Sequence, residues 1–234
     1  MLQDSVVLNA TRFIGVDAFE AVYYLQENTL VKYTKKETYY YQNNSLGAIL
    51  NVDLLNPLEI MVFYKDFNTV VQLDPTLAEI KTVNFNTTKN FMSAGYISTC
   101  SNHRFWVFNE NTLQIEIYNP NTQQKDAVTQ PIIGEIINIK SDYNYCWVLT
   151  KSQILKYNNY GNLLNTYEME TVDGFCKMKK NFILQQKNEL FVYNMQLKTK
   201  EKLQIPKITI QDVFVKAETV YIYDGNILYS YIIN

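Results

Sequence analysis

One recurring stretch constrains the fold of this chain more than any other feature. In each copy an apolar run ends in a short polar turn, and a second alternating run follows at once. The clearest copy is A-V-Y-Y-L-Q-E-N-T-L-V-K-Y-T at residues 21–34. Further copies cover residues 59–74, 104–119, 145–158, 181–194 and 219–232. Two strand-like runs around a tight polar turn indicate a β-hairpin in every copy.

The spacing of the copies predicts how the hairpins assemble. The first apolar residue after the turn falls at Leu30, Val70, Leu113, Ile154, Leu190 and Ile227. Neighbouring positions are 40, 43, 41, 36 and 37 residues apart. A period of about 40 residues with strand-like content is typical of a propeller blade, and a lone hairpin cannot bury its own apolar face. The alternative is a β-sandwich with hairpins of similar length. We predict an all-β, six-bladed β-propeller of four-stranded antiparallel blades.

The last blade lacks one strand. Residues 213–216, 219–223 and 227–233 supply three strands, and the sequence then ends. The strand-like segment Ser5–Ala10 has no blade of its own. We expect it to complete blade six as the outermost strand, because this closes the ring without open sheet edges between the first and last blades. Since the repeat spans the chain, we predict a single domain over residues 1–234.

The composition predicts which residues form the turns and whether the cysteines form disulfides. The 234 residues include only 7 glycines and 5 prolines, so Asn, Asp and Lys are expected to form most turns. The three cysteines are Cys100, Cys146 and Cys176. Their number is odd and Cys146 lies in a predicted strand, so we interpret them as small buried apolar residues and not as a disulfide framework.

An aspartate ends the first strand of several blades, at Asp17, Asp53 and Asp142. Around the first of them, the segment I-G-V-D-A-F-E-A-V-Y-Y-L at residues 14–25 resembles the NHL-type blade. The usual form of that blade has an Asp, a Gly-Asn turn and then an apolar strand, and the Gly-Asn pair is missing here. The resemblance covers single blades. It implies a bacterial propeller with NHL-like or quinoprotein-like repeats.

The repeated aspartates have two interpretations. They could form a ring of carboxylates near a central channel and hold Ca²⁺, as six-bladed lactonases and related hydrolases do. Alternatively, each carboxylate accepts hydrogen bonds from backbone N–H groups of its own turn. We favour the second interpretation, because the corresponding parts of blades five and six are rich in lysine. We therefore predict no metal site and no cofactor.

The sequence contains no arrangement of residues that is typical of catalysis. Its single histidine, His103, falls between two strands of blade three and is interpreted as a turn residue. One histidine cannot form a multi-histidine metal site. Nucleophile elbows, Cys-x-x-Cys pairs and phosphate-binding glycine loops are all missing. We predict that the protein is not an enzyme and has no catalytic residues. The alternative is a propeller hydrolase or lyase with a metal in the central channel.

Charge and hydropathy argue against nucleic-acid binding and against a membrane span. The chain has 21 basic and 23 acidic residues and a net charge of −2, and no block of like charge suits a phosphate backbone. No apolar run approaches the ~18 residues that indicate a membrane span. We therefore expect neither nucleic-acid binding nor a membrane span in this chain.

The loops are the remaining place for function. In a propeller, the turns between second and third strands share one face with the connections between blades. We predict that a partner binds at two such turns, through Lys65, Asp66, Phe67, Asn68, Asn109 and Glu110. Phe67 is an aromatic anchor in a polar turn, although its ring could instead fold back onto its own blade. The connection 206–211 offers Ile208 and Ile210 as an exposed patch or a buried plug.

We predict a monomeric, non-enzymatic propeller that binds protein partners. A sugar-binding propeller is a weaker candidate, because the 19 tyrosines mostly alternate within strands and so indicate packing. The tyrosine- and asparagine-rich sequence is similar to bacterial envelope proteins. We therefore expect a subunit or accessory of a cell-envelope complex, in the periplasm or at the outer membrane. Residues 1–4 lead directly into a strand, so we expect a mature N-terminus behind an added Met, with a cytoplasmic protein as the alternative.

Overall fold

The computed structural model describes residues 2–89 and 91–233. Within these ranges the chain forms six four-stranded antiparallel sheets, with strands numbered β1 to β24, and one short 3-10 helix, η1 (Asn44–Leu46). The chain divides into two compact units. Unit 1 contains Met1–Gln42 and Thr171–Asn234, and unit 2 contains Asn43–Glu170. Each unit contains three complete blades.

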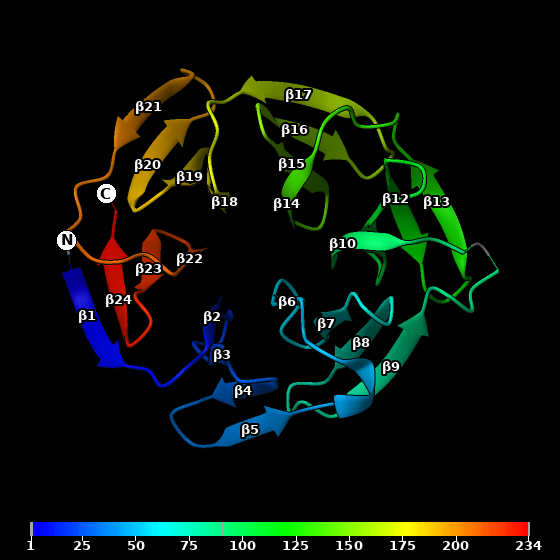
Figure 1. Ribbon diagram of the computed structural model, residues 1–234, viewed down its shortest axis with the longest axis horizontal. Coiled ribbons are helices and arrows are strands. Elements are labelled where there is room, and N and C mark those ends of the chain that lie inside the picture. The colour runs from blue at the N-terminus through cyan, green and yellow to red at the C-terminus, as the bar shows by residue number, and fades with distance from the viewer. Residues whose placement is uncertain (1, 90, 234) are drawn as a thin grey trace. The chain divides into compact units, whose positions relative to one another are not determined.

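Unit 1 contains blades one, five and six (Figure 1). Blade one is formed by β2 (Arg12–Val16), β3 (Val22–Gln26), β4 (Thr29–Tyr33) and β5 (Thr38–Tyr41). Blade five is formed by β18 (Gly174–Met178), β19 (Asn181–Gln186), β20 (Glu189–Asn194) and β21 (Thr199–Lys202). Blade six is formed by β22 (Asp212–Lys216), β23 (Thr219–Tyr223), β24 (Ile227–Ile232) and β1 (Leu2–Val7). The first strands of the three blades lie side by side, with β22 between β18 and β2.

Unit 2 contains blades two, three and four. Blade two is formed by β6 (Asn51–Asp53), β7 (Ile60–Tyr64), β8 (Thr69–Leu73) and β9 (Glu79–Asn84). Blade three is formed by β10 (Ala94–Thr99), β11 (Phe105–Asn109), β12 (Gln114–Asn119) and β13 (Gln124–Val128). Blade four is formed by β14 (Ile136–Ser141), β15 (Tyr145–Thr150), β16 (Gln153–Asn158) and β17 (Leu163–Glu168). Here β10 lies between β6 and β14.

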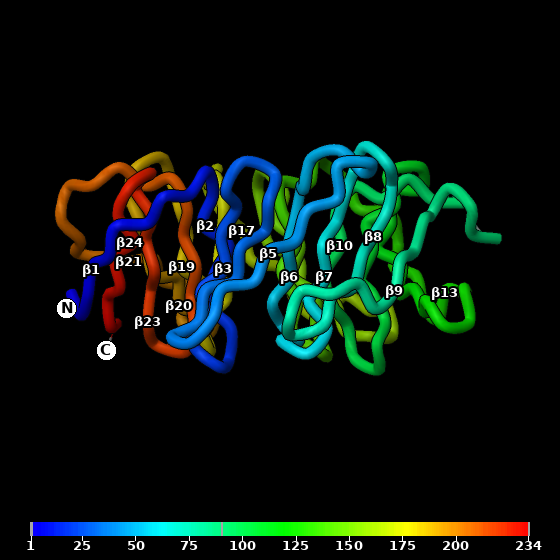
Figure 2. Tube along the Cα trace, turned by 90° about the horizontal axis from the view of Figure 1, so that it is seen from below, coloured from blue at the N-terminus to red at the C-terminus, as the bar shows by residue number. Residues whose placement is uncertain are grey.

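The predicted fold is confirmed: the protein is an all-β propeller of six four-stranded antiparallel blades. The N-terminal strand also completes blade six, because β1 pairs with β24 (Figure 2). Its predicted bounds, Ser5–Ala10, were wrong by three residues at each end. Residues 8–10 leave the sheet because the Tyr223 hydroxyl donates hydrogen bonds to the carbonyls of Leu8 and Ala10. These residues lead from the outer strand of blade six to the first strand of blade one.

The second and third strands of the blades form the core. All five residues of β7, β8 and β11 are buried, whereas all six residues of β1 are exposed. In unit 2, one apolar cluster joins Phe63 of blade two to Val107 of blade three. The next cluster joins Trp106 of blade three to Val148 of blade four. Blade three therefore buries its two faces against its neighbours, as the repeat predicts.

Close contact between blades one and six depends on one glycine. Gly15 in β2 faces the ring of Phe214 in β22. A Cβ atom at Gly15 would lie 2.5 Å from a ring carbon of Phe214. A side chain at this position would therefore clash with the ring of Phe214 unless that ring moved.

Asn and Asp side chains hold the turns, as the low glycine count predicts. A side-chain oxygen accepts a hydrogen bond from the backbone N–H two residues further on, which is the geometry of an Asx turn. Every blade contains such a turn, at Asp17, Asp53, Asn109, Asp142, Asn194 and Asp224. Lysines also occupy left-handed turn positions, with φ of 49° at Lys179 and 53° at Lys187.

The three cysteines are free thiols. Cys100 and Cys146 are buried, as predicted, and burial raises the pKa of the Cys146 thiol well above its usual value. The third, Cys176, is only half-buried in β18. Burial also raises the pKa of the Cys100 thiol, so neither Cys100 nor Cys146 is exposed as a reactive thiolate.

We expect deletion of residues 1–7 to destabilise the protein, because it removes β1 and uncovers the edge of β24. The side chains of β1 are exposed, so the loss comes mainly from the strand pairing and from new exposure of Leu228 and Tyr231, which are now 5% and 6% exposed. The expected decrease in the free energy of unfolding is about 2–3 kcal/mol. Urea unfolding of the full and shortened chains measures it, and equal values would contradict the pairing of β1 with β24.

Candidate protein-binding face

The predicted partner-binding residues lie in two neighbouring turns of unit 2. Residues 65–68 join β7 to β8, and residues 110–113 join β11 to β12. The Lys65 Nζ atom lies 2.8 Å from the Glu110 Oε1 atom, so an ion pair connects the turn of blade two to the turn of blade three. Both side chains are partly exposed, at 44% and 39%. The structure thus brings Lys65 and Glu110 together, as a shared binding surface requires.

The Phe67 ring is partly exposed, as a contact residue would be, and partly packed against the protein. Its side chain is 47% exposed. The covered part lies over Gly47 in the connection between blades one and two, where a Cβ atom would be 3.5 Å from the ring. The ring therefore rests on a backbone segment and presents its other part to solvent. Such a half-supported aromatic side chain has little conformational freedom to lose on binding.

Asn68 is buried and supports the turn from within. Its side-chain oxygen accepts a hydrogen bond from Ala94 N at 3.0 Å, and its amide donates to the Met92 carbonyl at 2.7 Å and to Asn86 Oδ1 at 3.0 Å. These bonds attach the connection before β10 to the turn of blade two. The sequence places Asn68 among the contact residues, but at 8% exposure it cannot reach a partner.

Asn109 is also buried, at 2% exposure. Its amide donates to Glu116 Oε1 at 2.8 Å, and its own oxygen accepts a bond from Asn111 N at 3.0 Å. Glu116 is 1% exposed and also pairs with Lys125 at 2.9 Å. Asn109 therefore stabilises a buried carboxylate. Of the six predicted contact residues, the exposed ones are Lys65, Asp66, Phe67 and Glu110.

Three exposed apolar residues on the same turns and connections were missed. Phe91 is 59% exposed before β10, Leu113 is 50% exposed before β12, and Ile133 is 90% exposed before β14. Two backbone hydrogen bonds link their segments, from Glu110 N to Ser93 O and from Ile132 N to Leu113 O. We call Phe67, Phe91, Leu113 and Ile133 the apolar contact residues.

Leu113 lies in a turn, although the sequence pattern places it in a strand. The repeat makes it the first residue of a strand, but it lies in the turn with φ of 57°, and β12 begins at Gln114. A leucine in the left-handed region is uncommon. The backbone therefore directs the Leu113 side chain out of a polar turn. Because this side chain is half-exposed, packing in the core does not explain why the position is apolar.

His103 lies in a turn, as predicted, and it is hydrogen-bonded to a carboxylate. The turn joins β10 to β11, φ of His103 is 58°, and its Nδ1 atom is 2.7 Å from Glu59 Oε2. Both residues line a cavity of about 230 Å³ in unit 2, together with Cys100, Arg104 and Tyr143. The guanidinium of Arg104 donates hydrogen bonds to Ser101 and to Asp126.

Each repeated aspartate accepts hydrogen bonds from its own turn, and Asp53 also accepts them from β10 of blade three. Asp17 accepts hydrogen bonds from Phe19 N and Ala21 N and from the Tyr23 hydroxyl, whose pKa is raised by burial and by this carboxylate. Asp53 accepts bonds from Leu55 N, Ser98 Oγ and Thr99 N, and Asp142 from Asn144 N and Tyr145 N. Across residues 2–89 and 91–233, no three His, Cys, Asp or Glu side chains are grouped closely enough to hold a metal ion.

In the connection 206–211 the two isoleucines pack inward and form no exposed patch, although the residues around them are exposed. Ile210 is 7% exposed and packs with Met178 and Val220, and Ile208 packs at the edge of the same cluster. The Asn188 side chain holds the segment by donating to Ile208 O and accepting from Ile210 N. In the part of the chain that the structure describes, no helix has the length and apolar character needed to cross a membrane.

Sequence comparison assigns no family, because no family model and no curated protein matches the chain. Several solved structures share the fold. The WD40 domain of Neurospora crassa Pan2 is 11% identical, with a TM-score of 0.64 over 94% of this chain and 74% of that one. Virginiamycin B lyase from Staphylococcus aureus is 12% identical, with a TM-score of 0.66 over 98% and 99%.

A chain in the mitotic checkpoint complex is also similar, with 6% identity and a TM-score of 0.69 over 100% of this chain and 94% of that one. At these identities the similarity establishes the propeller fold alone. The similar structures include a WD40 domain and a lyase, so the fold is shared by proteins of different activities.

We expect Asn68→Ala to lower the free energy of unfolding by about 2–4 kcal/mol, because it leaves the buried groups at Met92 and Ala94 without partners. Asp66→Ala, in the same turn but exposed, is the matched control, with an expected change within about 0.5 kcal/mol. Urea unfolding followed by tryptophan fluorescence measures both. Similar values for the two variants would contradict the supporting role of Asn68.

Proposed function

We propose that this protein is a non-enzymatic β-propeller that binds another protein through the turns and connections of unit 2. The observation that carries the proposal is the exposure of the apolar contact residues Phe67, Phe91, Leu113 and Ile133 on successive turns and connections. Exposed apolar side chains on rigid supports are typical of interfaces. Buried polar side chains such as Asn68 fix these supports.

The chemistry of this surface indicates the kind of partner. Aromatic and aliphatic anchors surrounded by polar residues match the organisation of protein interfaces, with an apolar centre and a polar rim. The Lys65–Glu110 ion pair offers one charge of each sign. Exposed ion pairs contribute little affinity but influence orientation. We therefore expect a folded partner that presents an apolar patch with nearby charges of both signs.

Two of the similar structures are consistent with this proposal. One is the mitotic checkpoint complex, and the other is BBS1N in complex with ARL6DN. A propeller fold thus occurs in protein assemblies. Within our proposal the partner belongs to a bacterial cell-envelope complex, which rests on the tyrosine- and asparagine-rich composition of the chain.

We expect Phe67→Ala to weaken partner binding by about 1–2 kcal/mol without unfolding the protein, because the ring is a half-exposed anchor outside the core. The tagged full chain is used to isolate a partner from the envelope fraction of native cells. The purified partner is then titrated against each variant by calorimetry. Phe19→Ala is the matched control, because Phe19 is 69% exposed on a different turn, in blade one.

Three results would count against the proposal. Equal affinities of the wild type, Phe67→Ala and Ile133→Ser would place the interface elsewhere. Unfolding of Phe67→Ala would show that the ring belongs to the core. Recovery of a specific partner only from the cytoplasmic fraction would contradict the envelope location.

A lyase-type activity is a second candidate, and the His103–Glu59 pair favours it. A carboxylate that binds Nδ1 orients an imidazole for acid-base chemistry, and this pair lines a cavity. Among the similar structures is a catalytically inactive histidine-to-alanine variant of virginiamycin B lyase with quinupristin. Activity of this chain on quinupristin can be measured directly.

If the protein is not an enzyme, as we propose, the purified protein should not convert quinupristin, with or without added Mg²⁺ or Ca²⁺. Mass spectrometry after prolonged incubation detects any product. His103→Ala is the matched variant, because its exposed side chain lies outside the core. Turnover by the wild type that is lost in His103→Ala would establish the enzyme and overturn the non-enzymatic assignment.

A further inference from the structure

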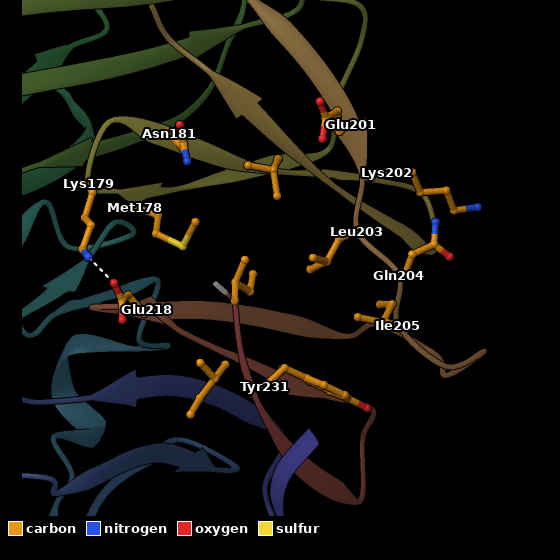
Figure 3. Close-up of a pocket in the computed structure, with 13 residues that line it drawn as sticks. Met178, Lys179, Asn181, Glu201, Lys202, Leu203, Gln204, Ile205, Glu218 and Tyr231 are labelled. Atoms are coloured by element: carbon orange, nitrogen blue, oxygen red, sulfur yellow. Dashed lines mark hydrogen bonds and ion pairs between the residues drawn. The ribbon is translucent and has the colours of Figure 1, made fainter. Parts of the chain in front are cut away.

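Unit 1 contains a larger cavity that no part of the proposed function uses. It lies between blades five and six and has a volume of about 570 Å³ (Figure 3). Its lining consists of Met178, Lys179, Asn181, Val192, Glu201, Lys202, Leu203, Gln204, Ile205, Glu218, Tyr231, Ile232 and Ile233. The volume falls within the range of roughly 300–1,000 Å³ that small-molecule sites occupy.

The apolar wall of the cavity comes from the end of blade five and the segment that follows it. Glu201 lies in β21, which ends at Lys202, and Leu203 and Ile205 come after the strand. The side chains of all three residues project to the same side (Figure 3). Val192 is paired with Glu201 across the strands and lies beside it. Leu203, Ile205 and Val192 are only partly buried against the core cluster of unit 1. The cavity is therefore an unfilled extension of that cluster.

Glu201 is the exception to the apolar pattern. Its neighbours at alternate positions are Leu203 and Ile205, yet this position has a carboxylate. Its side chain stands next to apolar Val192 on the face that lines the cavity. In residues 2–89 and 91–233 no cation forms an ion pair with Glu201.

The positive charges of the lining are already neutralised. Lys179 forms an ion pair with Glu218 at one end of the cavity (Figure 3). Lys202, which also lines the cavity, forms another with Glu189. An incoming anion would have to displace one of these carboxylates, whereas an incoming cation meets a carboxylate without a partner. The charges of the lining thus favour a positive ligand.

We propose that this cavity binds a small organic cation: an ammonium group attached to an aliphatic chain. The chain would lie against Val192, Leu203 and Ile205, and the ammonium group would pair with Glu201. Burial of the chain supplies most of the affinity, since the hydrophobic contribution grows with the apolar area removed from water. The ion pair selects the charge of the ligand. This site is independent of the protein-binding face of unit 2.

Calorimetric titration of the full chain with n-octylammonium and with 1-octanol tests the site and its charge preference. We expect octylammonium to bind with one-to-one stoichiometry and about fivefold more tightly than octanol, which is the scale of one solvent-accessible ion pair. Glu201→Gln should lower the affinity for octylammonium to that for octanol and leave octanol binding unchanged. Glu168→Gln is the matched control, because Glu168 is an exposed carboxylate on the outer strand of blade four.

Leu203→Trp fills the cavity and should abolish binding of both probes. Leu163→Trp, at an exposed position on β17 of blade four, should leave binding intact. Thermal melts establish that each variant folds, and Ile205→Phe replaces Leu203→Trp if the latter unfolds. Equal affinities of the two probes for the wild type, or unchanged octylammonium binding by Glu201→Gln, would overturn the assigned charge preference. Binding that survives in the folded cavity-filling variant would overturn the site itself.

Discussion

Each blade of this propeller has two apolar faces, and neither can be buried within the blade. The second strands show the consequence most clearly, because β7 and β11 are buried at every position. Clusters between neighbouring blades, such as the one that joins Phe63 to Val107, supply the missing partners. The outer strands remain exposed, as in β1. This packing leaves turns, connections and inter-blade cavities as the places where function can reside.

Side-chain hydrogen bonds determine what the turns present to solvent. With 7 glycines in the chain, Asn and Asp side chains occupy the interior of the turns and leave their neighbours outside. Asn68 points inward and holds Met92 and Ala94, while the adjacent Phe67 is half-exposed. At the edge of blade five, the Glu201 side chain projects to the same side as Leu203. The proposed protein-binding face and the proposed cation site thus follow from local geometry.

The sequence predicts the fold well because the repeat period and strand alternation are properties of the chain itself. The same reasoning correctly assigns the last blade to both chain ends, since β1 pairs with β24. The burial of Asn68 and Asn109 is not evident from the sequence, because polar turn residues look exposed until their partners in neighbouring segments are known. The cavity was not predictable, because Val192 and Leu203 look like ordinary strand residues and only the packing of blades five and six leaves space beside them.

The central functional claim is that a protein partner contacts the apolar residues on the turns and connections of unit 2. Site-specific incorporation of the photo-crosslinker p-benzoylphenylalanine in native cells tests this claim most directly. We expect the same protein to become cross-linked from positions 67 and 133, and not from position 19 in blade one. Cross-linking from position 19 but from neither position in unit 2, or no cross-link from any of them, would contradict the account.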